Sequence, residues 1–178
     1  MSDLVWYILA IVALIMLSAF FSGNETAYAT ANRLRLKAAA DAGKRSAKMA
    51  FRLYESFDRV LITILIGNNL VNIGASAVAT VIAVMLLGEG GAWLATLVMT
   101  ILIITFGEVL PKITAARSAG RFAARTSFLL TAIDTVLFPL VWLMQKLCDG
   151  MDRLWRKRIP AESAMTEDDL ETIFDTVE

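Results

Sequence analysis

The segment that decides the fold is Val60–Leu87, with the sequence VLITILIGNNLVNIGASAVATVIAVMLL. It is apolar, and as a helix it is long enough to cross a bilayer, which takes about 20 residues. Two further stretches of this kind extend from about Leu4 to Phe21 and from about Ala92 to Leu110. The whole chain is 57% hydrophobic and has a mean hydropathy of +0.63. We therefore predict an all-α membrane protein with three transmembrane helices and additional juxtamembrane helices.

The distribution of basic residues predicts how these helices cross the membrane. Asp3 is the only charged residue before the first span, and the turn Gly88–Gly91 contains no lysine or arginine. The other two connections are basic, so we expect the amino terminus outside and the carboxyl terminus in the cytoplasm, in the cell (inner) membrane. These basic residues are Arg33, Arg35, Lys37, Lys44, Arg45, Lys48, Arg52 and Arg59 after the first span, and Lys112, Arg117, Arg121 and Arg125 after the third.

A fourth apolar stretch, from about Phe128 to Leu147, contains Asp134 and Pro139 and has basic residues on both sides. Proline removes a backbone donor and bends a helix. Cytoplasmic charge at both ends of a broken segment favours a hairpin or an in-plane interfacial element around Pro139 over a crossing. A fourth span is the alternative.

The two basic connections have different patterns. The segment Asn32–Arg59 has the pattern of amphipathic helices interrupted at Gly43, and a solvated basic loop is the alternative. In the second connection, Arg117, Arg121 and Arg125 recur every four residues and would share one face of a helix. We expect this face to contact lipid phosphates, although membrane topology alone would also require the charges.

We assign residues 1–160 to a transmembrane domain with juxtamembrane helices, and residues 161–178 to an acidic cytoplasmic neck. Thr166 and Asp169 in the neck resemble a capping box, with a shorter carboxylate than the usual glutamate. A solvated helix face is the simpler interpretation of the acidic residues. A connection to a further cytosolic domain is the other.

Composition excludes several classes of function. The chain has no histidine and one cysteine, Cys148, so it lacks the residues for histidine-based catalysis, histidine-ligated zinc or a disulfide framework. We therefore predict that the protein is not an enzyme. Nucleic-acid binding is also disfavoured, because the basic clusters lie beside long apolar segments and suit a lipid bilayer. The amino-terminal end lacks the features of a cleaved signal peptide.

Polar residues at membrane depth are costly and mark candidate functional sites. Ser18 and Ser22 share one face of the first helix, and Asn68 and Asn72 share one face of the second, with Asn69 beside them. Small residues four apart are also a common packing device, and amides join membrane helices by hydrogen bonds. Either pair alone is therefore ambiguous between a ligand role and helix packing.

The third span ends in the most informative polar group. Pro111 has no N–H, so the carbonyl of Gly107, four residues earlier, lacks its usual α-helical partner. Glu108 places a carboxylate next to this carbonyl, as in the broken helices that coordinate cations in transporters. The alternative is a proline kink with an interfacial glutamate that pairs with Lys112.

These residues together supply six hard oxygen donors, which suit Mg²⁺, Ca²⁺ or Na⁺. Such a site requires the three helices to converge, and six donors would match the octahedral preference of Mg²⁺. A channel is disfavoured because the polar groups gather at one level and form no stripe along the spans. The candidate ligands are Ser18, Ser22, Asn68, Asn72, Glu108 and the carbonyl of Gly107.

Three motifs, in order and on successive spans, give the chain a family resemblance. Ser18–Ala27, with the core Ser-Gly-Asn-Glu-Thr-Ala, is similar to the opening of the transmembrane DUF21 domain of the CorC/CNNM (cyclin M) magnesium transporters. Gly67–Asn72 resembles the second-helix motif of that family, and Gly107–Lys112 resembles its third.

The resemblance implies a homodimer with three spans per protomer, a cytoplasmic belt of juxtamembrane helices, and a Mg²⁺ site at the six ligand positions named above. It also implies export of Mg²⁺ in exchange for Na⁺ by alternating access. Family members usually continue into a CBS-domain pair that binds ATP, and this chain stops at Glu178, before such a module. The alternative function is a membrane-anchored Mg²⁺-binding regulator or sensor without transport activity.

Overall fold

The computed structural model describes residues 2–88 and 90–156, which are helical apart from short connections. The elements are α1 (Ser2–Thr30), α2 (Arg33–Asp41), α3 (Arg45–Glu55), α4 (Phe57–Leu87), α5 (Gly91–Leu102), the π-helix η1 (Ile103–Val109), α6 (Leu110–Ala116), α7 (Ala119–Val136) and α8 (Phe138–Arg156). The segment up to Val141 is one compact unit, and α8 from Trp142 belongs to a second unit. The predicted neck, with its capping box at Thr166 and Asp169, lies outside the described residues.

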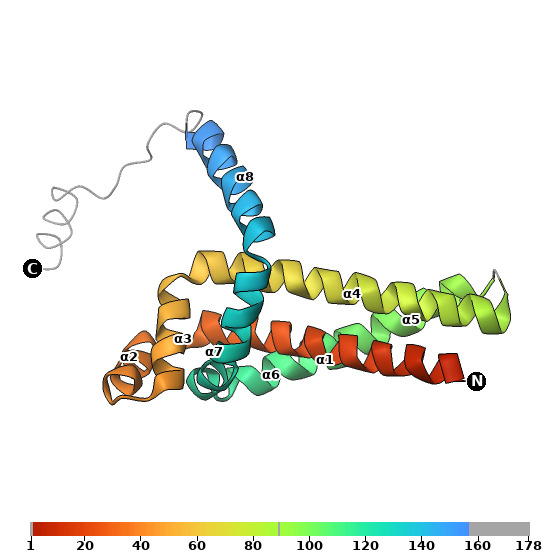
Figure 1. Cartoon of the computed structure of the whole chain (residues 1–178), viewed down its shortest axis with the longest axis horizontal. Coiled ribbons are helices and arrows are strands. Elements are labelled where there is room, and N and C mark those ends of the chain that lie inside the picture. Colours follow the sequence, from red (N-terminus) through yellow and green to blue (C-terminus); the bar gives the residue numbers. More distant parts are fainter. Residues whose placement is uncertain (1, 89, 157–178) are drawn as a thin grey trace, which may run out of the picture. The chain divides into compact units, whose positions relative to one another are not determined.

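In the first unit, α1 contacts both of the other spans, and Figure 1 shows it running alongside α4. It packs against α4 on one side and against η1 and α6 on another, while α5 packs against α4. The candidate spans are Leu4–Thr30, Phe57–Leu87 and Gly91–Ala116, the last built from α5, η1 and α6 in sequence. This confirms the predicted all-helical membrane fold with three spans.

The spans have an inside-out distribution of polarity. Trp6, Ile73 and Trp93 are 68–70% exposed, whereas Ser18 and Ser22 in the middle of α1 are fully buried. A soluble protein with such an apolar surface would aggregate, but lipid solvates it at no cost. The structure therefore describes a multi-pass membrane protein with an apolar exterior and buried polar side chains such as Ser18 and Ser22.

The first span is longer than the sequence indicated. The first apolar stretch ends at about Phe21, but α1 continues without interruption to Thr30. Gly23 faces the ring of Phe122, and Asn24 is buried, where its amide donates to the Phe20 carbonyl at 2.7 Å. These contacts stabilise a helical conformation in a segment whose composition is typical of a turn.

The first basic connection is helical, as predicted, and Gly43 separates α2 from α3 with a positive φ of 84°. Its apolar residues are buried against the ends of the spans, among them Leu36, Ala47 and Leu53. It is therefore packed structure and not a solvated loop. Two alanines of α4 that are four residues apart, Ala75 and Ala79, are buried in one cluster with residues of α5.

The second basic connection corrects one prediction. Arg117 cannot share a helix face with Arg121 and Arg125, because the chain leaves the helical conformation at Ser118, between α6 and α7. The fourth apolar stretch is broken as expected, but the break is at Leu137 and Pro139 lies in the first turn of α8. Counting α7 and α8 as one bent pair would give four candidate spans instead of three.

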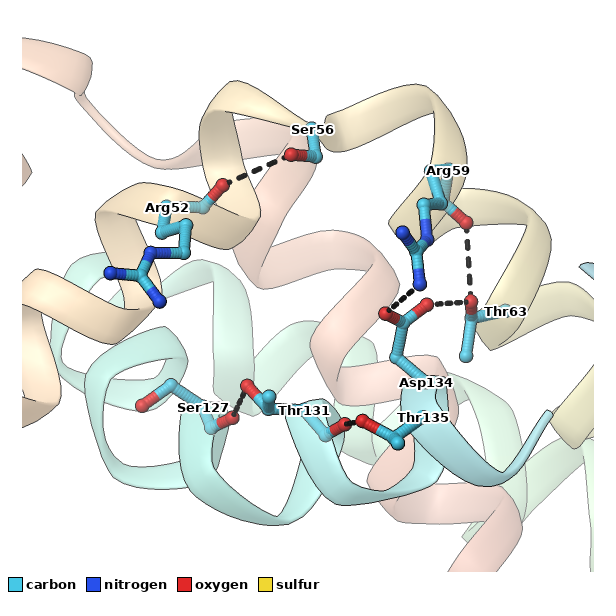
Figure 2. A network of polar contacts seen from close by, with 8 residues as sticks. All are labelled: Arg52, Ser56, Arg59, Thr63, Ser127, Thr131, Asp134 and Thr135. Carbon is cyan, nitrogen blue, oxygen red and sulfur yellow. Dashed lines mark hydrogen bonds and ion pairs between the residues drawn. The ribbon is translucent and has the colours of Figure 1, made fainter. Parts of the chain in front are cut away.

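A polar network fixes α7 to the start of α4, as Figure 2 shows. The Arg59 guanidinium donates to Asp134 at 2.8 Å, and the Thr63 hydroxyl donates to the other carboxylate oxygen at 2.7 Å. The guanidinium also lies over the ring of Phe138, 5.2 Å from its centroid. Because the Asp134 side chain is largely buried, these contacts replace the hydrogen bonds that water would otherwise give its carboxylate.

We predict that Asp134→Asn destabilises the protein by about 1–3 kcal/mol, because it leaves the Arg59 charge without an anionic partner in a partly buried position. The matched control is Glu55→Gln, which breaks the exposed pair with Arg33 at 3.9 Å and should change stability by less than about 0.5 kcal/mol. Thermal unfolding in detergent measures both. Equal shifts in the two variants would contradict this account.

Candidate cation site

The predicted ligands on α1 lie on its buried face. Ser18 and Ser22 are four residues apart, about one turn of helix, and both are buried on the face of α1 that packs against α4, η1 and α6. A serine in a membrane helix can satisfy its hydroxyl by bonding to its own backbone. Ser18 instead bonds to two other helices.

The Ser18 side chain on α1 contacts both of the other spans. Its hydroxyl lies 2.9 Å from the amide oxygen of Asn68 on α4 and 3.4 Å from the carbonyl oxygen of Gly107 in η1. Two further predicted oxygen donors, 50 and 89 residues away in sequence, therefore lie within hydrogen-bonding distance of this hydroxyl.

A second contact joins α4 to η1 one turn along α4. The Asn72 amide donates to the Glu108 carboxylate at 3.4 Å, and both side chains are partly buried. Lys112 does not pair with Glu108, which was the alternative interpretation of this glutamate. It pairs with Glu25 on α1 at 3.1 Å, so the nearby lysine is neutralised by a different carboxylate.

The backbone around Gly107 differs from the expected broken helix. Residues 103–109 form a π-helix, in which the Leu110 N–H donates to the Thr105 carbonyl, five residues back. The chain stays helical and Pro111 lies at the start of α6, where a missing N–H is tolerated. A π-helical turn is wider than an α-helical one and is frequent at functional sites. Here it contains both Gly107 and Glu108.

Two glycines permit the close approach of the helices. A Cβ at position 107 would lie 2.7 Å from the Ser18 hydroxyl oxygen. A Cβ at position 67 would overlap the ring of Phe21, which packs directly on the α4 backbone. Both positions therefore require glycine for α1 to reach Asn68 and Gly107 at hydrogen-bonding distance.

The donor set has the character of a cation site. Among the described residues, the Ser22 hydroxyl and the Asn72 amide oxygen are buried without a hydrogen-bond partner, and both are predicted ligands. A buried acceptor without a partner is costly, and a bound cation would satisfy it. Glu108 is the one acidic residue among the six predicted ligands. In the described part of the chain, no three acidic, cysteine or histidine side chains cluster closely enough to hold a metal ion.

Sequence reasoning missed the π-helix, the contact of Phe21 with Gly67, and the pair between Glu25 and Lys112. The motif around Gly67 was a usable signal, because a glycine inside a membrane helix often marks close packing. No local signal in the sequence predicts whether Lys112 pairs with Glu25 or with Glu108, since the lysine side chain is long and flexible.

The comparisons with known proteins identify the family of the chain. The family described as the cyclin M transmembrane N-terminal domain matches residues 9–178. The chain belongs to this family. This cyclin M domain is thus a membrane domain, as the inside-out fold already indicated.

The relatives of this cyclin M domain are longer proteins. The inner membrane protein YfjD of Escherichia coli is 40% identical over 159 residues, covering 88% of this chain and 37% of YfjD. A UPF0053 protein of Haemophilus influenzae is 44% identical over 138 residues, covering 78% of this chain and 33% of that protein. A polyamine export protein of Haemophilus influenzae is 31% identical over 176 residues, covering 92% of this chain and 41% of that protein. The chain thus spans about a third of the first two relatives.

We predict that Gly107→Ala destabilises this cyclin M domain by about 1–3 kcal/mol, because the added methyl group collides with Ser18 and separates α1 from η1. Gly120→Ala is the control, since a Cβ there meets nothing within 4 Å and alanine is the better helix former. Adding Ser18→Ala to Gly107→Ala should restore part of the loss by removing the colliding oxygen. Unfolding midpoints in detergent test this, and equal stability of the two alanine variants would contradict it.

Proposed function

We propose that this domain exports Mg²⁺ in exchange for Na⁺, through the oxygen donors that α1, α4 and η1 present to one another. The observation that supports the proposal is the position of Ser18, whose hydroxyl lies within hydrogen-bonding distance of both Asn68 and the Gly107 carbonyl. In this proposal the amino terminus is outside and the basic connections face the cytoplasm.

The chemistry of the donors favours a small, hard cation. All six are oxygen atoms, and hydroxyl, amide, carbonyl and carboxylate oxygens are the ligands of Mg²⁺ and Na⁺. A cation at this site would replace the hydrogen bonds from Ser18 to Asn68 and from Asn72 to Glu108, and would recruit the unpartnered Ser22 and Asn72 oxygens. Binding would therefore exchange weak mutual hydrogen bonds for contacts with the ion.

Charge balance accounts for release of the ion. Glu108 provides one negative charge, which neutralises Na⁺ fully and Mg²⁺ by half, while neutral dipoles supply the rest. A site with a single carboxylate holds a divalent ion without trapping it. We propose that Na⁺ and Mg²⁺ compete for these same oxygens, which is the simplest form of coupling between the two.

The whole protein is proposed to act as a homodimer, with an ATP-binding CBS-domain pair following the neck. Both elements come from the family resemblance. The additional length of the relatives is compatible with such a module, because this chain corresponds to about a third of YfjD.

A relative's name suggests a second candidate cargo. The polyamine export protein of Haemophilus influenzae is 31% identical to this chain, so an organic polycation is the alternative substrate. A polyamine carries several separated positive charges and would require several separated carboxylates. The proposed site has Glu108 alone, and the neighbouring Glu25 is paired with Lys112. These features favour an inorganic ion.

We predict that Asn72→Ala and Glu108→Gln abolish Mg²⁺ flux driven by a Na⁺ gradient in proteoliposomes of the full-length protein. Asn69→Ala is the matched control, because Asn69 is exposed and its amide bonds to the Leu65 carbonyl of its own helix. This variant should transport as well as the wild type.

The same preparation separates the alternatives. If Mg²⁺ binds in a way that depends on Glu108 but no gradient drives its flux, the protein is a Mg²⁺-binding regulator and not an exchanger. Flux of spermidine that Mg²⁺ does not inhibit would identify the organic cation as cargo. Unchanged Mg²⁺ flux in both ligand variants would rule out this site.

A further inference from the structure

A second polar site lies away from the candidate cation site, in a cavity of about 500 Å³ at the basic end of the spans. Its walls come from the end of α1, from α2 and α3, and from the junction between α6 and α7. This volume is within the range of small-molecule binding sites and exceeds what a packing defect would leave. The cation site is lined by different residues.

The lining of the cavity is strongly cationic. Four basic side chains face it and no acidic side chain does: they are Arg35, Lys44, Arg117 and Arg121. In the part of the chain that the structure describes, the three ion pairs involve other basic residues, namely Arg33, Arg59 and Lys112. Within residues 2–88 and 90–156, the cavity therefore gathers four charges that no carboxylate within ion-pair distance neutralises, and their mutual repulsion favours an anion between them.

Two helix amino termini add backbone donors to the same cavity. The first turns of α3 and α7 line it, at Ser46 and Ala47 and at Ala119 and Gly120. Neither helix has a side-chain cap or an acidic residue in its first turn, whereas α2 is capped by Asn32, which accepts from the Arg35 N–H at 3.0 Å. The leading N–H groups of α3 and α7 thus remain available to an anion.

The cavity also lies at a defined depth. Thr30 ends the first candidate span and Ala116 ends the third, and both residues line the cavity. The ends of spanning helices coincide with the layer of lipid head groups. An anion at this level is most readily supplied by the membrane itself, and basic pockets at this level bind phosphorylated head groups.

We propose that this cavity is a binding site for the phosphate group of an acidic phospholipid. The phosphate oxygens would accept from the four basic side chains and from the first-turn N–H groups of α3 and α7, while the acyl chains extend along the exposed apolar surface of the spans. The bound lipid would connect α2, α3 and α7 to the ends of α1 and α6. This site is independent of cation transport.

The test uses the purified full-length protein in detergent, with three added probes: phosphatidylglycerol, phosphatidylcholine and soluble glycerol 3-phosphate. Thermal unfolding and retention of lipid in native mass spectrometry are the readouts. We expect phosphatidylglycerol to stabilise the protein and to be retained, and phosphatidylcholine to have little effect. Arg117→Gln and Arg121→Gln should each weaken phosphatidylglycerol binding about five-fold.

Two further variants separate binding from folding. Gly120→Asp places a carboxylate in the mouth of the cavity, where a Cβ meets no neighbour, and an acidic residue in a first turn stabilises the helix. It should therefore fold well and yet lose the lipid effect, while Gly120→Asn should retain it. Arg125→Gln removes an exposed charge of α7 that does not line the cavity, and should bind phosphatidylglycerol as the wild type does.

The outcomes are distinct. A lipid effect that is lost in Gly120→Asp and retained in Arg125→Gln supports the proposal. Stabilisation by glycerol 3-phosphate alone would keep a phosphate site but overturn its assignment to lipid. Equal losses in Arg121→Gln and Arg125→Gln would show a diffuse surface charge, and no response to any probe would overturn the site.

Discussion

The arrangement of the spans depends on one contact, the approach of the Ser18 hydroxyl to the Asn68 amide and the Gly107 carbonyl. Apolar side chains cannot drive helix association in lipid, because lipid solvates them as well as a neighbouring helix does. Close backbone approach and interhelical hydrogen bonds must supply the specificity. Gly67 and Gly107 provide the space and Ser18 provides the bonds, so the residues that assemble the helices are also the residues proposed to bind the cation.

Because the same residues pack the helices and are proposed to bind the cation, few substitutions at these positions would preserve both roles. In a soluble protein, the core and the binding site are usually separate sets of residues. Here the fully buried positions of α1 include the polar Ser18, Ser22 and Asn24 together with the apolar Tyr28. The hydrogen bonds among the proposed ligands maintain the packing while they remain weak enough for an ion to replace.

The polar residues below the cation site have a different role. Arg59, Thr63 and Asp134 join α4 to α7, and the cavity lined by Arg117 and Arg121 lies where α6 ends and α7 begins. Only the first of these joins a juxtamembrane helix to a span by an ion pair. Charged groups of both kinds are stable near the membrane surface, where water or lipid phosphates can solvate them. The candidate cation ligands, in contrast, are neutral oxygen donors with a single carboxylate.

The amino-acid sequence was enough to predict the fold class, the three spans, the helical connection after the first span, and a set of candidate cation ligands. Each of these follows from composition and periodicity, which act over a few neighbouring residues. Only the tertiary structure decided the remaining features: the continuation of α1 through Ser22–Thr26, the π-helix at Gly107, and the pairing of Lys112 with Glu25 instead of Glu108. These depend on contacts between segments far apart in sequence, such as Ser18 with Gly107 and Asn24 with Thr126, and local propensity contains no information about such contacts.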